Sequence, residues 1–197
     1  MIMSLRNGGR PLKYHWGSLS GINSFICRRI AYQNTYMPRP LEHSRWGIMP
    51  QTWIIMGGAN VGKSALIRAL TGVARKTENW PVATRSGTIN VTIYVRSLQE
   101  KGISPGQFIQ QNKGASYILL PLRVNATRRF PDGLQYILTF LQAGWVVNDI
   151  VVLNRTSLPY SLPQGAPPPY FIPQHIGRRG MPANQAASIV KQRWNWL

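Results

Sequence analysis

A glycine-rich stretch between an apolar run and a helical pattern constrains the fold more than any other feature. The apolar run covers residues 52–56, and the following turn fits G-x-x-x-x-G-K-[ST] at Gly57, Gly62, Lys63 and Ser64. Glycines let backbone N–H groups wrap a phosphate, Lys63 can reach the outer phosphates, and Ser64 can offer its hydroxyl to magnesium. The helix that begins at Lys63 also directs its N-terminal dipole at the anion. This context predicts a phosphate-binding loop.

Strand and helix patterns alternate on both sides of this loop. The continuous apolar run 117–122 predicts a central strand of a parallel sheet, whereas the strict alternation over 88–95 favours a half-buried strand at a sheet edge. Residues 74–87 are polar and predict a loop. Alternation of this kind predicts a three-layer α/β domain with a mostly parallel sheet. The other expected elements are a strand over 52–56, a helix from Lys63 that Gly72 caps, a helix from Ser104 to about Gln111, a helix that Asp132 caps and Gly144 stops, and a strand over 150–153.

The length and the distribution of apolar residues suggest one compact domain with two extensions. The 197 residues fit a single domain, which we place at residues 49–156. No run approaches the roughly 18–20 apolar residues of a membrane span, so we expect no such span.

The N-terminal extension, residues 1–48, is basic and carries Glu42 as its only acid. It shows no sustained helical or strand period, which predicts a flexible arm or one that a partner orders. Three interpretations stay open: a nucleic-acid arm, an organelle-targeting leader, and residues upstream of the natural start. Met49 stands immediately before the domain and keeps the third interpretation open.

The C-terminal extension, residues 157–197, combines a proline-rich connector with an amphipathic helix. Residues 157–182 hold the proline-rich part, which predicts an extended segment that lies over the domain or leads away from it. The helix that follows docks either on its own domain or on a partner. Its apolar stripe consists of Ala183, Ala187, Val190, Trp194 and Leu197.

Charge is the second strong signal. The chain has 23 Lys and Arg against five acids, a formal net charge of +18. This balance favours a polyanionic partner, either nucleic acid or an acidic surface. The single cysteine, Cys27, excludes an intramolecular disulfide framework and fits a reducing compartment. We therefore expect a cytoplasmic protein.

The span of roughly residues 50–160 resembles the P-loop NTPases, with features of two branches. The motif Asn60-Val61-Gly62-Lys63-Ser64 and the helix end Ala69-Leu70-Thr71-Gly72 resemble the first motif of small translation- and ribosome-associated GTPases. The segments Leu120-Pro121-Leu122-Arg123 and Val152-Leu153-Asn154-Arg155 resemble the ParA/MinD ATPase branch. In that branch the asparagine contacts the adenine, so the resemblance assigns base contact to Asn154.

The resemblance implies a bound ATP or GTP with magnesium. Lys63 would be the catalytic residue and Ser64 the metal ligand. The expected nucleotide-binding residues are Gly57, Gly58, Ala59, Asn60, Val61, Gly62, Lys63, Ser64, Ala65, Asn154 and Arg155.

The sequence departs from both branches. Gly58 stands where the ParA/MinD branch carries an extra lysine, and Asn154-Arg155-Thr156-Ser157 lacks the acid that ends the GTPase base motif. No acid follows a predicted central strand to hold magnesium through water. Binding should therefore persist, while hydrolysis should be slow or need a partner. The five acids are Glu42 in the arm, Glu78 and Glu100 in expected loops, Asp132 at a helix cap and Asp149 before its strand.

Two functions follow from these patterns. The first is a nucleotide-binding switch or weak NTPase, in one version a ParA/MinD-like ATPase that acts as a homodimer or with a protein partner. The second is a basic nucleic-acid-binding or structural protein that keeps the fold with a degenerate nucleotide site.

Overall fold

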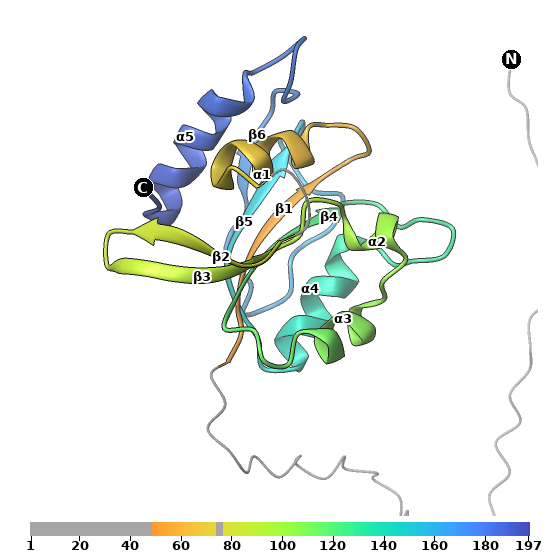
Figure 1. The fold of residues 1–197 in the computed structure, drawn as a ribbon. Coiled ribbons are helices and arrows are strands. Elements are labelled where there is room, and N and C mark those ends of the chain that lie inside the picture. The colour runs from red at the N-terminus through yellow and green to blue at the C-terminus, as the bar shows by residue number, and fades with distance from the viewer. Residues whose placement is uncertain (1–48, 74–76) are drawn as a thin grey trace, which may run out of the picture. The chain divides into compact units, whose positions relative to one another are not determined.

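The computed structural model describes residues 49–73 and 77–197, and these residues form a six-stranded sheet with helices on both faces (Figure 1). The strands lie in the order β2-β3-β4-β1-β5-β6. In chain order the elements are β1 (Gln51–Gly57), α1 (Lys63–Thr71), β2 (Thr77–Thr84), β3 (Gly87–Ile93), α2 (Leu98–Lys101), α3 (Pro105–Gln111), β4 (Tyr117–Arg123), α4 (Gly133–Gln142), β5 (Val146–Leu153), β6 (Tyr170–Ile172) and α5 (Ala183–Trp194).

The strand that leads into the glycine-rich loop lies inside the sheet. β1 pairs in parallel with β4 on one side and with β5 on the other. β3 pairs in parallel with β4 and β6 with β5, and only the β2–β3 pair is antiparallel. The α/β class with a mostly parallel sheet is thereby confirmed. Because Gly57 pairs with Arg123 in the β1–β4 register, the loop that follows β1 lies beside the carboxyl end of β4.

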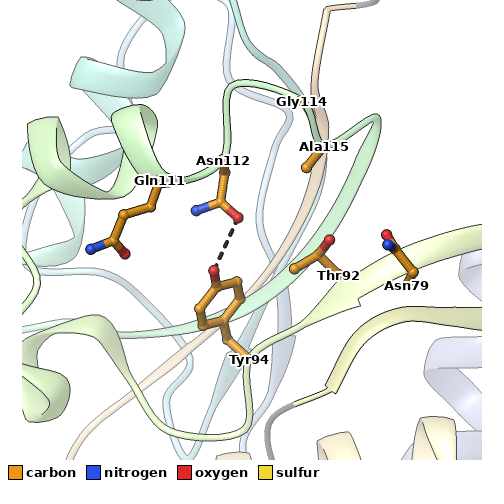
Figure 2. Close-up of a pocket in the computed structure, with 7 residues that line it drawn as sticks. All are labelled: Asn79, Thr92, Tyr94, Gln111, Asn112, Gly114 and Ala115. Carbon is orange, nitrogen blue, oxygen red and sulfur yellow. Dashed lines mark hydrogen bonds between the residues drawn. The ribbon is translucent and has the colours of Figure 1, made fainter.

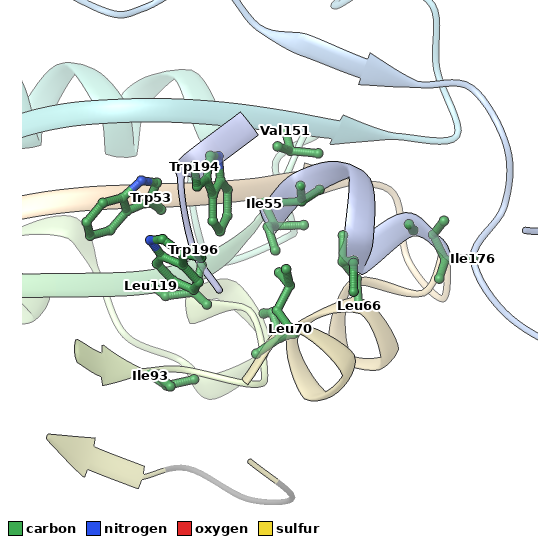
Figure 3. Close-up of a cluster of buried hydrophobic side chains, with 14 of the residues drawn as sticks. Trp53, Ile55, Leu66, Leu70, Ile93, Leu119, Val151, Ile176, Trp194 and Trp196 are labelled. Carbon is green, nitrogen blue, oxygen red and sulfur yellow. The ribbon is translucent and has the colours of Figure 1, made fainter. Parts of the chain in front are cut away.

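Alternate residues of β1 face two separate apolar cores, which make the sheet the middle of three layers. On one face, Trp53 and Ile55 pack with α1, with α5 through Trp194, and with Trp196, which follows α5 (Figure 3). On the other face, Ile54 and Met56 pack with side chains of α2, α3 and α4. Burial on both faces explains why β1 is a continuous apolar run rather than an alternating one.

Local capping signals correctly predicted three helix boundaries. Gly72 ends α1 in a left-handed conformation, with φ of 74°, and its N–H donates to Arg68 O. Ser104 and Gln107 form the predicted capping box of α3. Asp132 caps α4 by accepting a hydrogen bond from the Gln135 N–H.

The loop predicted over 74–87 is wrong for most of its length, because residues 77–84 form β2. Among the six strands this one pairs with β3 alone and lies at the edge of the sheet, where a proline such as Pro81 is tolerated. Its end also forms a single bridge from Thr84 to Trp196. β3 therefore is not the edge strand that its alternation suggested, and Val91–Ile93 are buried. β5 also begins earlier than predicted, at Val146.

The proline-rich segment and the last helix contribute to this same fold. β6 lies within residues 157–182 and extends the sheet beside β5. α5 packs on α1, so the alternative in which the last helix docks on its own domain is the one observed. Within 49–73 and 77–197, no helix is both long enough and apolar enough to cross a membrane. The N-terminal arm, residues 1–48, lies outside the described residues.

Candidate phosphate-binding site

The glycine-rich loop turns the chain from β1 into α1 through two left-handed residues. Asn60 has φ of 56° and Gly62 has φ of 96°. Gly62 is the N-cap of α1 and has no side chain, so no side chain caps the first amide groups of the helix. A helix N-terminus with uncapped amides and a favourable dipole is suited to an anion. The predicted strand–loop–helix arrangement is thus present.

Lys63 is the buried cation of this loop, with 6% of its surface exposed. Its Nζ donates hydrogen bonds to Gly57 O, at 3.2 Å, and to Gly58 O. An ammonium group has three N–H donors, so one remains for a ligand. Burial lowers the pKa of Lys63 to about 8, an effect that Glu100 opposes and Arg123 strengthens. A bound anion would offset this cost of burying the positive charge.

Ser64 is oriented by the segment that follows β3. Its Oγ donates to Val95 O at 2.7 Å. A hydroxyl that donates its proton still has two lone pairs, so the oxygen can ligate a cation in this orientation. Oxygen ligands are what magnesium prefers, and the structure therefore fits the predicted role of Ser64.

A cavity of about 240 Å³ opens at this loop. Two of the lining residues come from the start of α2, its N-cap Ser97 and Glu100, and the sequence patterns did not place them here. Ser97 is 1% exposed and its Oγ has no hydrogen-bond partner among the described residues. Glu100 belongs to α2 rather than to the loop that was predicted for it. The lining residues are Asn60, Val61, Gly62, Lys63, Ser64, Ala65, Ser97 and Glu100.

A sequence signal for this segment exists. Ser97-Leu98-Gln99-Glu100 fits the S-x-x-E pattern of a helix start, and Ser97 is indeed the N-cap of α2. The Ser97 side chain makes no capping hydrogen bond, however. Both polar side chains of the pattern instead line the cavity, so the motif predicts the helix but not the use of its side chains.

Asn154 and Arg155, the predicted base-contacting residues, follow β5 next to the start of the loop. Asn154 is left-handed, with φ of 57°, and its N–H donates to Ile172 O at 2.7 Å. The preceding residue, Leu153, lies beside Gly57. Neither Asn154 nor Arg155 lines the 240 Å³ cavity. Their contact with a base remains a prediction.

The segment between β6 and α5 covers the loop from another side. Ile176 N–H donates to Val61 O at 3.2 Å. A Cβ at Gly62 would lie 2.3 Å from Ile176 O, so only glycine fits this close approach. The sequence patterns treated this segment as part of a connector and gave no sign of the contact.

Several other polar and charged residues lie away from the loop. Arg85 and Thr84, at the β2–β3 turn, line a cavity of about 520 Å³ beside Trp194 and Trp196. Asp149 lies inside β5 rather than before the strand, and it accepts hydrogen bonds from Arg193 and Trp194. Asp149 therefore anchors α5 to the sheet, and it does not line the cavity at Lys63.

Another cavity, of about 470 Å³, is also larger than the cavity at Lys63, and amide and hydroxyl side chains line it (Figure 2). Tyr94 donates to Asn112 Oδ1 at 3.0 Å, and Asn79, Thr92 and Gln111 complete much of the wall. None of the residues that line it is charged. A polyphosphate requires cations and amide donors, so the smaller cavity at Lys63 is the better candidate for this ligand.

Comparison with known families supports the same segment. The family model described as 50S ribosome-binding GTPase matches residues 52–101, about a quarter of the chain, from β1 to the end of α2. No curated protein and no solved structure matches the chain significantly. The match supports the GTPase resemblance over these residues, and nothing in the comparisons supports the ParA/MinD branch or ATP.

Proposed function

We propose that this protein binds GTP, with the loop from Gly57 to Ser64 holding the phosphates. The observation that carries the proposal is the state of Lys63: a buried ammonium with a remaining donor, at the wall of a cavity next to uncapped helix amides. Among the described residues, Lys63 has no acidic hydrogen-bond partner. A buried cation in this state favours an anionic ligand, because the ligand's charge offsets the desolvation.

The preference for GTP over ATP is supported by the family match over residues 52–101. Asn154 and Arg155 would contact the base from the end of β5. The GTPase base motif ends in an acid, and Thr156-Ser157 follow here instead. We therefore expect the protein to prefer GTP over ATP less strongly than a protein whose base motif ends in a carboxylate.

Magnesium would be held in part by Ser64, whose oxygen keeps its lone pairs while it donates to Val95 O. A bound magnesium ion would neutralise charge that develops on the phosphates. Lys63 would contribute to the same neutralisation by donating to the outer phosphates, which is the role predicted for it. β3 ends at Ile93 and supplies no carboxylate beside Ser64, so we expect slow hydrolysis.

A ribonucleoprotein partner is the second part of the proposal. The description of the matched family contains the words 50S ribosome-binding, and this chain carries a net charge of +18. Exposed Arg128 and Arg129 follow β4, and exposed Arg178 and Arg179 follow β6. These loops leave the carboxyl ends of parallel strands, as does the phosphate loop, so bound nucleotide could alter a contact that they make with RNA.

Equilibrium titration of the full-length protein with GTP, GDP and ATP, in the presence of magnesium, tests nucleotide binding. The proposal predicts saturable binding of one GTP per chain, with weaker binding of ATP. Absence of GTP binding would contradict the proposal. Equal affinities for GTP and ATP would refute only the preference for guanine. Cosedimentation with large ribosomal subunits, with GTP and with GDP, tests the partner; equal amounts of bound protein in both would exclude nucleotide control.

A further inference from the structure

The segment from Val95 to Glu100 forms one side of the phosphate-binding cavity. Val95 O accepts the hydrogen bond from Ser64 Oγ, and Ser97 and Glu100 line the cavity together with residues of the loop. The phosphate loop and this segment are therefore in contact before any ligand is considered. The cavity is therefore lined by the cation of Lys63 and by the side-chain oxygens of Ser97 and Glu100.

Buried anchors fix this segment in place. Leu98 is fully buried in the core that β1 shares with α4. The Gln99 side chain is 5% exposed, accepts from the Arg123 N–H at 3.1 Å and donates to Arg123 O at 3.3 Å. Because Ser97 and Glu100 flank these anchors, their positions at the cavity are set by packing rather than by a mobile loop.

The Ser97 hydroxyl is a buried polar group with no partner among the described residues. Such groups are rare in folded proteins, and each needs a specific explanation, such as a bound water or ion. Ser97 is also one of the residues that line the phosphate-binding cavity. Its oxygen is therefore positioned for a ligand that enters this cavity.

The Glu100 carboxylate is held by one oxygen and keeps the other available. Arg123 donates from Nε, at 3.3 Å, and from Nη2, at 3.1 Å, and both hydrogen bonds go to Oε1. Within the described part of the chain, Oε2 accepts no hydrogen bond. The arginine thus orients the carboxylate while one oxygen remains for a cation or for its water.

We infer that Ser97 and Glu100, together with Ser64, form the protein's share of a magnesium site, with Glu100 in place of an acid at the end of a central strand. The inference rests on the proposed GTP binding, because the phosphates would supply the remaining ligands. Hydroxyl and carboxylate oxygens suit a hard divalent cation. The described residues contain no group of three or more His, Cys, Asp and Glu side chains that could hold a metal by themselves, which agrees with a site that depends on nucleotide.

The test measures the magnesium concentration that half-saturates the GTP-bound full-length protein. GTP affinity is determined by titration in EDTA and at increasing MgCl₂, for the wild type, Glu100→Gln, Ser97→Ala and Asp132→Asn. Loss of an outer-shell ligand lowers metal affinity about 10–100-fold, so Glu100→Gln should raise the midpoint by about tenfold or more, and Ser97→Ala should raise it less. Asp132→Asn is the matched control, since it removes the same charge from a carboxylate that caps α4 and does not line the cavity.

Each result supports the inference or overturns it. A raised midpoint in Glu100→Gln, with Asp132→Asn within about threefold of the wild type, supports a role for the carboxylate in cation binding. An unchanged midpoint in Glu100→Gln, or equal increases in both variants, overturns the inference while GTP binding stands. A GTP affinity of the wild type that does not change with magnesium concentration also overturns the inference while GTP binding stands. Wild-type protein that binds no GTP in either buffer overturns the proposed function and this inference together. Thermal unfolding of each variant confirms that it is folded.

Discussion

His175 Nε2–H donates a hydrogen bond to the backbone oxygen of Asn60 at 2.8 Å, although 115 residues separate the two. The neighbouring Ile176 bonds to Val61 O, so two consecutive residues of the β6–α5 segment contact two consecutive residues of the phosphate loop. The shape of the loop therefore depends on a part of the chain that carries no nucleotide motif.

This dependence predicts that Gly62→Ala is more damaging than Gly72→Ala. Both glycines have positive φ, so alanine costs about 1–2 kcal/mol in conformational strain at either position. A Cβ at Gly72 meets nothing within 4 Å, whereas one at Gly62 collides with the Ile176 backbone. Overpacking adds about 1–3 kcal/mol at Gly62. Denaturant unfolding of both variants measures the difference in the free energy of unfolding. Equal decreases would show that the β6–α5 segment does not pack closely against the loop.

The pKa of Lys63 predicts how GTP affinity changes with pH. The pKa of the free protein's Lys63 is about 8, and a bound phosphate raises it by favouring the charged form. Below pH 8 the ammonium is already charged, so affinity should be flat. Above pH 8 binding requires proton uptake, so affinity should fall by up to about tenfold per pH unit.

Titrations at pH 7, 8 and 9 measure this effect. Lys63→Ala is the control, because a variant without the amine should bind weakly and should lose the decrease between pH 8 and 9. A wild-type affinity that rises with pH would be inconsistent with phosphate binding at Lys63.

Asp149→Ala should destabilise the fold without a direct effect on the site. Asp149 is 6% exposed and accepts from Arg193 Nη2 at 2.8 Å and from Trp194 Nε1 at 2.7 Å. The variant leaves the indole N–H without an acceptor, and breaking a buried ion pair costs about 3–5 kcal/mol. We expect about 3 kcal/mol, because Arg193 remains partly exposed. Asp132→Ala, which removes a helix cap, should cost about 1 kcal/mol. Urea unfolding measures the free energy of unfolding of both variants. Equal decreases in Asp149→Ala and Asp132→Ala would argue against the role of Asp149 in anchoring α5.

Gly106→Ala should stabilise the protein. Gly106 is the second residue of α3, has no positive φ, and a Cβ there would meet nothing within 4 Å. Alanine in a helix is favoured over glycine by about 0.5–1 kcal/mol. Gly144→Ala is the contrasting variant, since φ of 79° at an equally open position makes alanine unfavourable. A loss of stability in Gly106→Ala would contradict the assigned helix geometry.

The elements that local chemistry encodes could be predicted from the sequence. The motif from Gly57 to Ser64, the capping box at Ser104 and the cap at Asp132 each act over a few residues, and the structure has them where they were predicted. β2 was missed because its stability comes from pairing with β3, while Pro81 and the polar residues around it resemble a loop. β6 was missed for the same reason, since three residues in a proline-rich segment carry no pattern of their own.

At the site, the sequence predicted the residues of one contiguous motif and missed those that the fold brings to it. Ser97 and Glu100 lie more than 30 residues from Lys63 and reach the cavity through the path of β3 and the anchoring of α2. Ile176 approaches Gly62 only because β6 pairs with β5. No periodicity or spacing reports such long-range packing.

The central claim is that the loop around Lys63 holds the phosphates of GTP. It is tested most directly by calorimetric titration of GTP into the wild type, Lys63→Ala and Lys113→Ala, all in the same magnesium buffer. Lys113 is exposed in the turn after α3, so its variant loses the same charge elsewhere. A hydrogen bond to a charged group contributes about 1.5–3 kcal/mol, which predicts a loss of about 10–150-fold in Lys63→Ala and almost none in Lys113→Ala. Equal GTP affinity in the wild type and Lys63→Ala would contradict the account.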